Sequence, residues 1–127
     1  MVKVVLADDE EYVRVFLNMV MESLSYEVVA EVGKGDELPS VMEEFQPDLL
    51  LLDINMPNLT GIEFLEQYAS KFPRTCIIIL TSLSLMELVN NPALSTVNCF
   101  LRKNTPVVEM VAAITQTWTE FEAKKYP

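Results

Sequence analysis

The sequence predicts an α/β protein with a parallel sheet covered by helices on both faces, and three observations predict it. Short apolar segments alternate five times with segments of helical periodicity along 127 residues. The apolar segments, such as "VVLA" and "LLLL", are continuous, which is typical of strands buried on both faces of a parallel sheet. Acidic, hydroxyl and basic residues follow several of them directly, at the sheet edge where such folds bind ligands.

Five segments are predicted as strands from their runs of β-branched and other apolar residues. Acids follow the first run, Gly33 and Gly35 follow the second, and Pro47 precedes the third. The predicted strands are Val2–Ala7, Glu27–Val32, Leu49–Leu52, Cys76–Leu80 and Val97–Leu101. Five such units in a chain of this length fit the flavodoxin-like, doubly wound (βα)5 sandwich with strand order 2-1-3-4-5, rather than an eight-stranded barrel.

The first two helices follow from apolar spacing. Asp9 is placed to cap a helix over Glu10–Leu24. Its buried stripe is predicted to be Val13, Phe16, Leu17, Val20 and Leu24. Tyr12, Val15 and Met19 lie beside that stripe and are interpreted first as a wider core, with a docking face as the alternative. A second helix is expected over residues 37–45, with its proline in the first turn.

The later helices are predicted from capping signals. A T-x-x-E capping box at Thr60 opens a helix to about Lys71. A second capping box at Ser84 opens another helix, which Asn90-Asn91-Pro92 is expected to cut short. Thr105 is predicted to cap the last helix, with a proline at its first position. The buried stripe of that helix is predicted to be Val107, Val111, Ile114, Trp118 and Phe121.

Composition excludes several classes of function. A formal net charge of −10 argues against a nucleic-acid surface and favours cations or basic partners. The lack of histidine excludes Ser-His-Asp triads and zinc sites built on histidine. Cys76 and Cys99 are expected to be free and buried. With no signal peptide or run long enough to cross a membrane, we expect a cytoplasmic protein with one domain over residues 1–124 and a tail over 125–127.

Polar residues gather where the predicted strands end. Asp8-Asp9, Asp53, Thr81-Ser82 and Arg102-Lys103 follow strands one, three, four and five, which are neighbours in the predicted order. Three carboxylates at one place repel one another, and a bound Mg²⁺ ion would offset that repulsion. A hydroxyl and an ammonium group nearby suit a phosphoryl group, and an aspartate carboxylate is a nucleophile toward phosphorus. These strand ends therefore predict a site that holds a phosphoryl group on a carboxylate.

At these motifs the chain resembles the receiver domain of two-component response regulators. The matching segments are "VVLADDEE", "LLLLDINMPNLTG", "IIILTS" and "FLRK". The resemblance implies that Asp53 is the phosphoacceptor and that Mg²⁺ binds Asp8, Asp9, Asp53 and the backbone carbonyl of Asn55. It also implies that Thr81 bonds the phosphoryl group, that Lys103 is its counter-ion, and that Phe100 is the switch aromatic.

The resemblance also implies a function and its partners. A sensor histidine kinase or a histidine-phosphotransfer protein would donate the phosphoryl group and dock on the first helix. Phosphorylation would then reshape the face formed by the segment after Thr81, the strand over 97–101 and the last helix. That face would bind a downstream protein, an output domain or a second copy in a homodimer. The domain would catalyse only its own phosphoryl transfer and dephosphorylation, either as a stand-alone receiver or as part of a longer regulator.

Three features depart from the family pattern. Asn104 replaces the usual proline after Lys103, so the peptide bond between them is expected to be trans. The helix after Ser84 is expected to be short, and Leu83, Leu85 and Met86 in that segment are interpreted either as ordinary packing or as a partner surface.

Two alternatives to the switch remain open. A pseudo-receiver would bind partners without using its pocket, although the set Asp8, Asp9, Asp53, Thr81 and Lys103 is complete. A phosphatase of the haloacid-dehalogenase type would carry a second aspartate two residues after its nucleophile, where this chain has Asn55.

Overall fold

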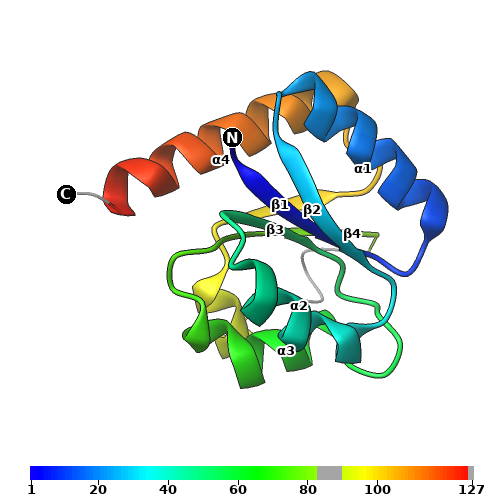
Figure 1. Cartoon of the computed structure of the whole chain (residues 1–127), viewed down its shortest axis with the longest axis vertical. Helices are drawn as coiled ribbons and strands as arrows, with labels where there is room; N and C mark the ends of the chain where they lie inside the picture. The colour runs from blue at the N-terminus through cyan, green and yellow to red at the C-terminus, as the bar shows by residue number, and fades with distance from the viewer. Residues whose placement is uncertain (83–89, 126–127) are drawn as a thin grey trace.

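The chain forms one five-stranded parallel sheet in the order β2-β1-β3-β4-β5, which confirms the predicted topology (Figure 1). The structure is a computed structural model that describes residues 1–82 and 90–125. The strands are β1 (Lys3–Ala7), β2 (Glu27–Val32), β3 (Leu49–Leu52), β4 (Cys76–Thr81) and β5 (Cys99–Arg102). β3 and β4 are buried at every residue, as expected for the central strands of a parallel sheet.

Helices cover both faces of the sheet (Figure 1). On one face, α1 (Glu11–Ser23) and α4 (Val107–Lys125) pack on a buried cluster that includes Leu6, Leu51 and Ile78. On the other face, α2 (Leu38–Phe45) and α3 (Gly61–Tyr68) pack on a second cluster. Within residues 1–82 and 90–125, three short 3-10 helices extend this second layer or its loops: η1 (Gly35–Glu37), η2 (Ala69–Lys71) and η4 (Pro92–Thr96).

Strand register brings the predicted site residues to one edge. Ala7 at the end of β1 pairs with Leu52 at the end of β3, so the next residues, Asp8 and Asp53, lie on neighbouring strands. The backbone N–H of Asp53 also donates to the Ala7 carbonyl at 2.9 Å. β4 lies on the other side of β3 and ends at Thr81, which pairs with the last residue of β5. The topology alone therefore groups the strand ends as predicted.

The start of α1 differs from the prediction. Glu10, rather than Asp9, occupies the N-cap position, and it makes no side-chain capping bond. The Asp8 carboxylate instead accepts a hydrogen bond from the backbone N–H of Glu10 at 2.9 Å. Asp9 is exposed, because the chain leaves β1 with the side chain of Asp8 turned inward. The prediction that Asp9 caps this helix is wrong.

Five of the ten residues predicted for the buried stripes of α1 and α4 are buried, and Val111 and Phe121 in α4 are half-buried. Phe16 and Leu24 are half-buried, while Met21 is fully buried and completes the α1 stripe. Val107 is 49% exposed because α4 begins there, before the helix reaches the sheet. Met110 takes the predicted core position at that end of α4.

The capping box at Thr60 is confirmed by two reciprocal hydrogen bonds. The Glu63 N–H donates to Thr60 Oγ1 at 3.1 Å, and the Thr60 N–H donates to Glu63 Oε1 at 3.0 Å. The capping box predicted at Ser84 lies outside the described residues, as do Leu83, Leu85 and Met86. Downstream, the Asn91 side chain accepts from the Ala93 N–H at 3.0 Å and opens η4. α4 starts one residue later than predicted, with the Pro106 carbonyl accepting from the Met110 N–H.

Both cysteines are free, as predicted. Cys76 is buried, and burial raises the pKa of its thiol to about 12. Cys99 is half-buried in β5, so only Cys76 matches the expected burial. Among the described residues, no helix combines the length and the apolar character that crossing a membrane requires.

Candidate functional site

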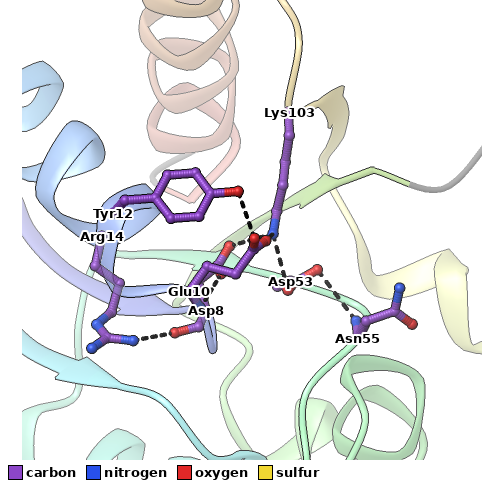
Figure 2. A network of polar contacts seen from close by, with 7 residues as sticks. All are labelled: Asp8, Glu10, Tyr12, Arg14, Asp53, Asn55 and Lys103. Atoms are coloured by element: carbon purple, nitrogen blue, oxygen red, sulfur yellow. Dashed lines mark hydrogen bonds and ion pairs between the residues drawn. The ribbon is translucent and has the colours of Figure 1, made fainter.

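The site lies at the carboxyl edge of the sheet and is built around two buried carboxylates. The side chains of Asp8 and Asp53 are each 2% exposed. Each follows directly after a fully buried strand end, which explains why a charged residue can be held below the surface. The Asn55 N–H donates to Asp53 Oδ1 at 3.2 Å, which holds the carboxylate near its own loop. Figure 2 shows the Asn55 side chain directed away from Asp53.

The loop after Asp53 is held by close backbone packing. The Gly61 N–H donates to the Ile54 carbonyl at 2.8 Å, which closes the turn that leads into α3. A Cβ atom on Gly61 would lie 2.6 Å from the Asp53 carbonyl oxygen, closer than real contacts of this kind. A Cβ on Gly35 would lie even closer to the Leu59 carbonyl oxygen, at 1.6 Å. Glycine at these two positions therefore lets the loops beside Asp53 approach one another.

Lys103 joins the carboxylates from the opposite side of the site (Figure 2). Its ammonium lies 2.9 Å from Asp8 Oδ2, 3.2 Å from Asp53 Oδ2 and 2.8 Å from Glu10 Oε1. The backbone of Lys103 is held as well, because its N–H donates to the Thr81 carbonyl at 2.9 Å. Asn104 follows Lys103 through a trans peptide bond, as predicted. The lysine thus reaches the pocket without the usual proline after it.

Burial and charge act in opposite directions on these groups. Burial, and then the charge of Asp8, raise the pKa of Asp53 to about 6, although Lys103 opposes both. Burial also raises the pKa of Asp8, again against the effect of Lys103. Burial by itself would lower the pKa of Lys103, but hydrogen bonds to Glu10 and Asp8 and the charge of Asp53 raise it overall. The lysine therefore stays charged, whereas Asp53 loses its proton closer to neutral pH than an ordinary aspartate does.

The acidic groups of the site fit a hard divalent cation. Asp8, Asp9 and Glu10 each offer a carboxylate oxygen within 4.8 Å of the others. This cluster shares Asp8 and Asp9 with the predicted metal site but contains Glu10 where the prediction has Asp53. Apart from its ion pair with Lys103, the buried Asp8 Oδ2 accepts no hydrogen bond among the described residues. Carboxylate oxygens with free lone pairs, in a pocket of excess negative charge, are the donors that Mg²⁺ prefers.

Glu10 and Tyr12 belong to the site although the sequence analysis did not place them there. Glu10 makes the shortest contact to Lys103, and its Oε2 accepts a hydrogen bond from the Tyr12 hydroxyl at 2.5 Å. Glu10 lies 93 positions from Lys103 in the sequence, and no local spacing signals such a pair. Glu10 directly follows Asp8-Asp9, but the sequence predicts it only as the first residue of the helix over Glu10–Leu24.

The remaining predicted residues are spread over β4 and β5. Thr81 is fully buried at the end of β4, the strand next to β3. Phe100 is half-buried and packs against the cluster beneath α2 and α3, whereas Cys99 and Leu101 pack on the opposite face. Ser82 and Arg102 are exposed. The structure therefore brings Asp8, Asp53 and Lys103 into contact, with Thr81 on the adjoining strand and Phe100 one strand further.

Comparison with known families agrees with this geometry. Residues 4–115, most of the chain, match the family described as "Response regulator receiver domain". The chain belongs to the response regulator receiver family. This receiver domain is therefore a signalling domain of two-component systems rather than an ordinary enzyme, and membership removes the dehalogenase-type phosphatase from consideration. Receiver domains generally bind Mg²⁺ in an acidic pocket, and response regulators interact with histidine kinases and output domains.

Curated relatives differ in how much of their own length this receiver domain covers. It is 37% identical over 110 residues to the uncharacterized transcriptional regulatory protein YhcZ of Bacillus subtilis, covering 86% of this chain and 51% of that protein. It is 32% identical over 89 residues to the chemotaxis protein CheY of Listeria monocytogenes, covering 70% of this chain and 75% of that protein. The chain thus spans about half the length of the first of these relatives.

Solved structures agree on the fold. The BeF3-activated N-terminal receiver domain of Klebsiella pneumoniae RstA is 26% identical, with a TM-score of 0.80 over 91% of this chain and 97% of that one. A CheY-like receiver domain protein from Methanospirillum hungatei superposes with a TM-score of 0.85 at 22% identity, covering 98% of each chain. The flavodoxin-like fold predicted from the strand pattern is therefore shown.

Proposed function

We propose that this receiver domain is a phosphorylation-dependent switch with Asp53 as its phosphoacceptor. The observation that carries the proposal is the contact of the buried Asp53 carboxylate with Lys103, beside the second buried carboxylate of Asp8. An aspartate with a purely structural role would not be expected where burial and the charge of Asp8 raise its pKa to about 6. A site whose negative charges need a cation is suited to bind one together with a phosphoryl group.

In the proposed reaction an oxygen of Asp53 attacks the phosphorus of a phosphohistidine or a small acyl phosphate. The new O–P bond forms as the bond from phosphorus to the donor breaks, and the donor leaves with that electron pair. Asp8, Asp9, Asp53 and the backbone carbonyl of Asn55 would hold Mg²⁺, which supplies positive charge to the phosphoryl oxygens when bound. Lys103 would move from carboxylate to phosphoryl oxygen, because its ammonium already lies 3.2 Å from Asp53.

The readout of phosphorylation would pass through Thr81 and Phe100. Thr81 is buried at the end of β4, next to the strand that ends before Asp53, so its hydroxyl is placed to bond a phosphoryl group on Asp53. Phe100 lies on β5, which pairs with β4 at its carboxyl end. A change at Thr81 would therefore be passed to the half-buried ring of Phe100 and to the surface beside it.

The exposed face of α1 supports docking of the phosphoryl donor. Tyr12, Val15 and Met19 are 71%, 56% and 66% exposed, so the interpretation of these residues as a wider core is wrong. Their alternative, a docking face, fits the place of Tyr12 beside the site (Figure 2). We propose that a histidine kinase or histidine-phosphotransfer protein binds there, and that an output domain or downstream protein reads the β4–β5 side.

The first test is the intact mass of the protein after incubation with acetyl phosphate. We expect the gain of one phosphoryl group with Mg²⁺, no gain with EDTA, and no gain in Asp53→Asn. Glu11→Gln provides a matched control, because Glu11 is exposed and carries the same charge outside the pocket. If the folded wild type gains no phosphoryl group under any condition, the pseudo-receiver alternative replaces the switch.

A further inference from the structure

Lys103 makes its shortest contact with a residue outside the set that the receiver family implies. Its ammonium lies 2.8 Å from Glu10 Oε1, compared with 3.2 Å from Asp53 Oδ2. The Glu10 side chain is 38% exposed, whereas the Asp53 side chain is 2% exposed. Glu10 therefore contacts the lysine from the more exposed side of the site.

Tyr12 fixes the second oxygen of Glu10. The Tyr12 hydroxyl donates to Glu10 Oε2, and Glu10 in turn draws the pKa of that hydroxyl upward. Both oxygens of Glu10 are thus engaged, one by Lys103 and one by Tyr12 (Figure 2). This arrangement makes Glu10 a partner of the lysine rather than a free ligand for a metal ion, although its carboxylate lies near those of Asp8 and Asp9.

We propose that Glu10 is a positioning residue that competes with the phosphoryl group for Lys103, and that Tyr12 holds Glu10 in place. The inference rests on the proposed phosphorylation of Asp53. A phosphoryl group on Asp53 must take over the ammonium that Glu10 now binds, and the negative charge of Glu10 repels the incoming dianion. Both effects oppose phosphorylation. The chain Tyr12–Glu10–Lys103 also connects the exposed face of α1 to the pocket through three side chains.

The experiment compares the rate of phosphoryl gain from acetyl phosphate and Mg²⁺ in four proteins: wild type, Glu10→Gln, Tyr12→Phe and Glu11→Gln. We expect Glu10→Gln to be labelled about two- to fivefold faster than Glu11→Gln, which has the same net charge, because one partly exposed ion pair is lost. Tyr12→Phe keeps every charge and removes one hydrogen bond, so its rate is expected between those of wild type and Glu10→Gln. High salt should shrink the excess, because it screens partly exposed charges.

The possible outcomes separate this inference from the proposed function. If wild type itself is not labelled, the phosphorylation of Asp53 fails and the inference fails with it. If wild type is labelled but Glu10→Gln is no faster than Glu11→Gln, only the competition is overturned. A merely structural role for Glu10 would lower the unfolding temperature and slow the labelling, with no salt dependence. A Tyr12→Phe rate equal to wild type would remove Tyr12 from the inference and leave Glu10.

Discussion

The ammonium of Lys103 lies 3.2 Å from the Asp53 carboxylate, and the same ammonium contacts Asp8 and Glu10. One cation thus faces three carboxylates, two of them buried. The imbalance leaves negative charge in the pocket, and this excess adds to burial, which is the main cause of the raised pKa values of Asp53 and Asp8.

The ionised form of Asp53 is expected to destabilise the fold at neutral pH. Its pKa in the folded protein is about 6, above the ordinary value of 3.8, so the folded state binds this proton more tightly than the unfolded state. The destabilisation is therefore complete above pH 6 and disappears as the pH falls toward 4. Asp53→Asn should raise the free energy of unfolding by up to about 3 kcal/mol at pH 7.5 and by roughly half as much at pH 5. Urea unfolding in EDTA measures both values, and a gain that grows on acidification would contradict the argument.

Magnesium is expected to stabilise the folded domain through the acidic cluster. At a Mg²⁺ concentration ten times its dissociation constant, binding to the folded state alone adds about 1.4 kcal/mol, which raises the melting temperature by about 4–7 °C. Asp9→Asn should abolish this gain with little effect on the protein in EDTA, because Asp9 is exposed. Thermal unfolding with and without Mg²⁺ measures the effect, with Glu11→Gln as control. An undiminished gain in Asp9→Asn would remove Asp9 from the metal site.

Gly61→Ala is expected to disturb the loop that carries Asp53. The added Cβ would meet the Asp53 carbonyl oxygen at 2.6 Å and the Ile54 Cα at 2.9 Å, and both are backbone atoms that cannot turn aside. We expect a loss of about 1–3 kcal/mol of stability, the usual cost of overpacking, together with slower labelling by acetyl phosphate. Gly33→Ala is the matched control, because its Cβ would meet the guanidinium of Arg14 at 3.3 Å and no backbone atom. Equal effects of the two substitutions would argue against the close approach at Gly61.

Thr81 variants are expected to separate phosphorylation from its readout. Thr81→Ser keeps the hydroxyl, whereas Thr81→Val keeps the branched shape and loses it. If the hydroxyl bonds the phosphoryl group, phosphorylation should change hydrogen exchange over Cys99–Arg102 in wild type and in Thr81→Ser, and much less in Thr81→Val. Peptide-level hydrogen–deuterium exchange with and without acetyl phosphate makes the measurement. A full response in Thr81→Val would show that the signal reaches β5 without this hydroxyl.

Much of the fold was predictable because a local run of apolar residues is enough to predict a buried strand. The run Leu49–Leu52 is buried at all four residues, and the strand Glu27–Val32 begins and ends at the predicted residues. The capping box at Thr60 forms as predicted, because its two hydrogen bonds span only three residues. The ends of α1 and β5 were less accurate, since Glu10 at the N-cap and Cys99 at the strand start depend on neighbours from other elements.

The sequence by itself determined the strand order and the carboxylates, hydroxyl and lysine at the strand ends, because parallel strands with continuous apolar runs leave one polar edge. Only the tertiary structure decided how those side chains pair. The contact of Glu10 with Lys103 joins residues 93 positions apart. The exposure of Tyr12 and Met19 depends on how α1 is rotated about its axis against the sheet. Such outcomes arise from packing between distant elements, for which local spacing carries no signal.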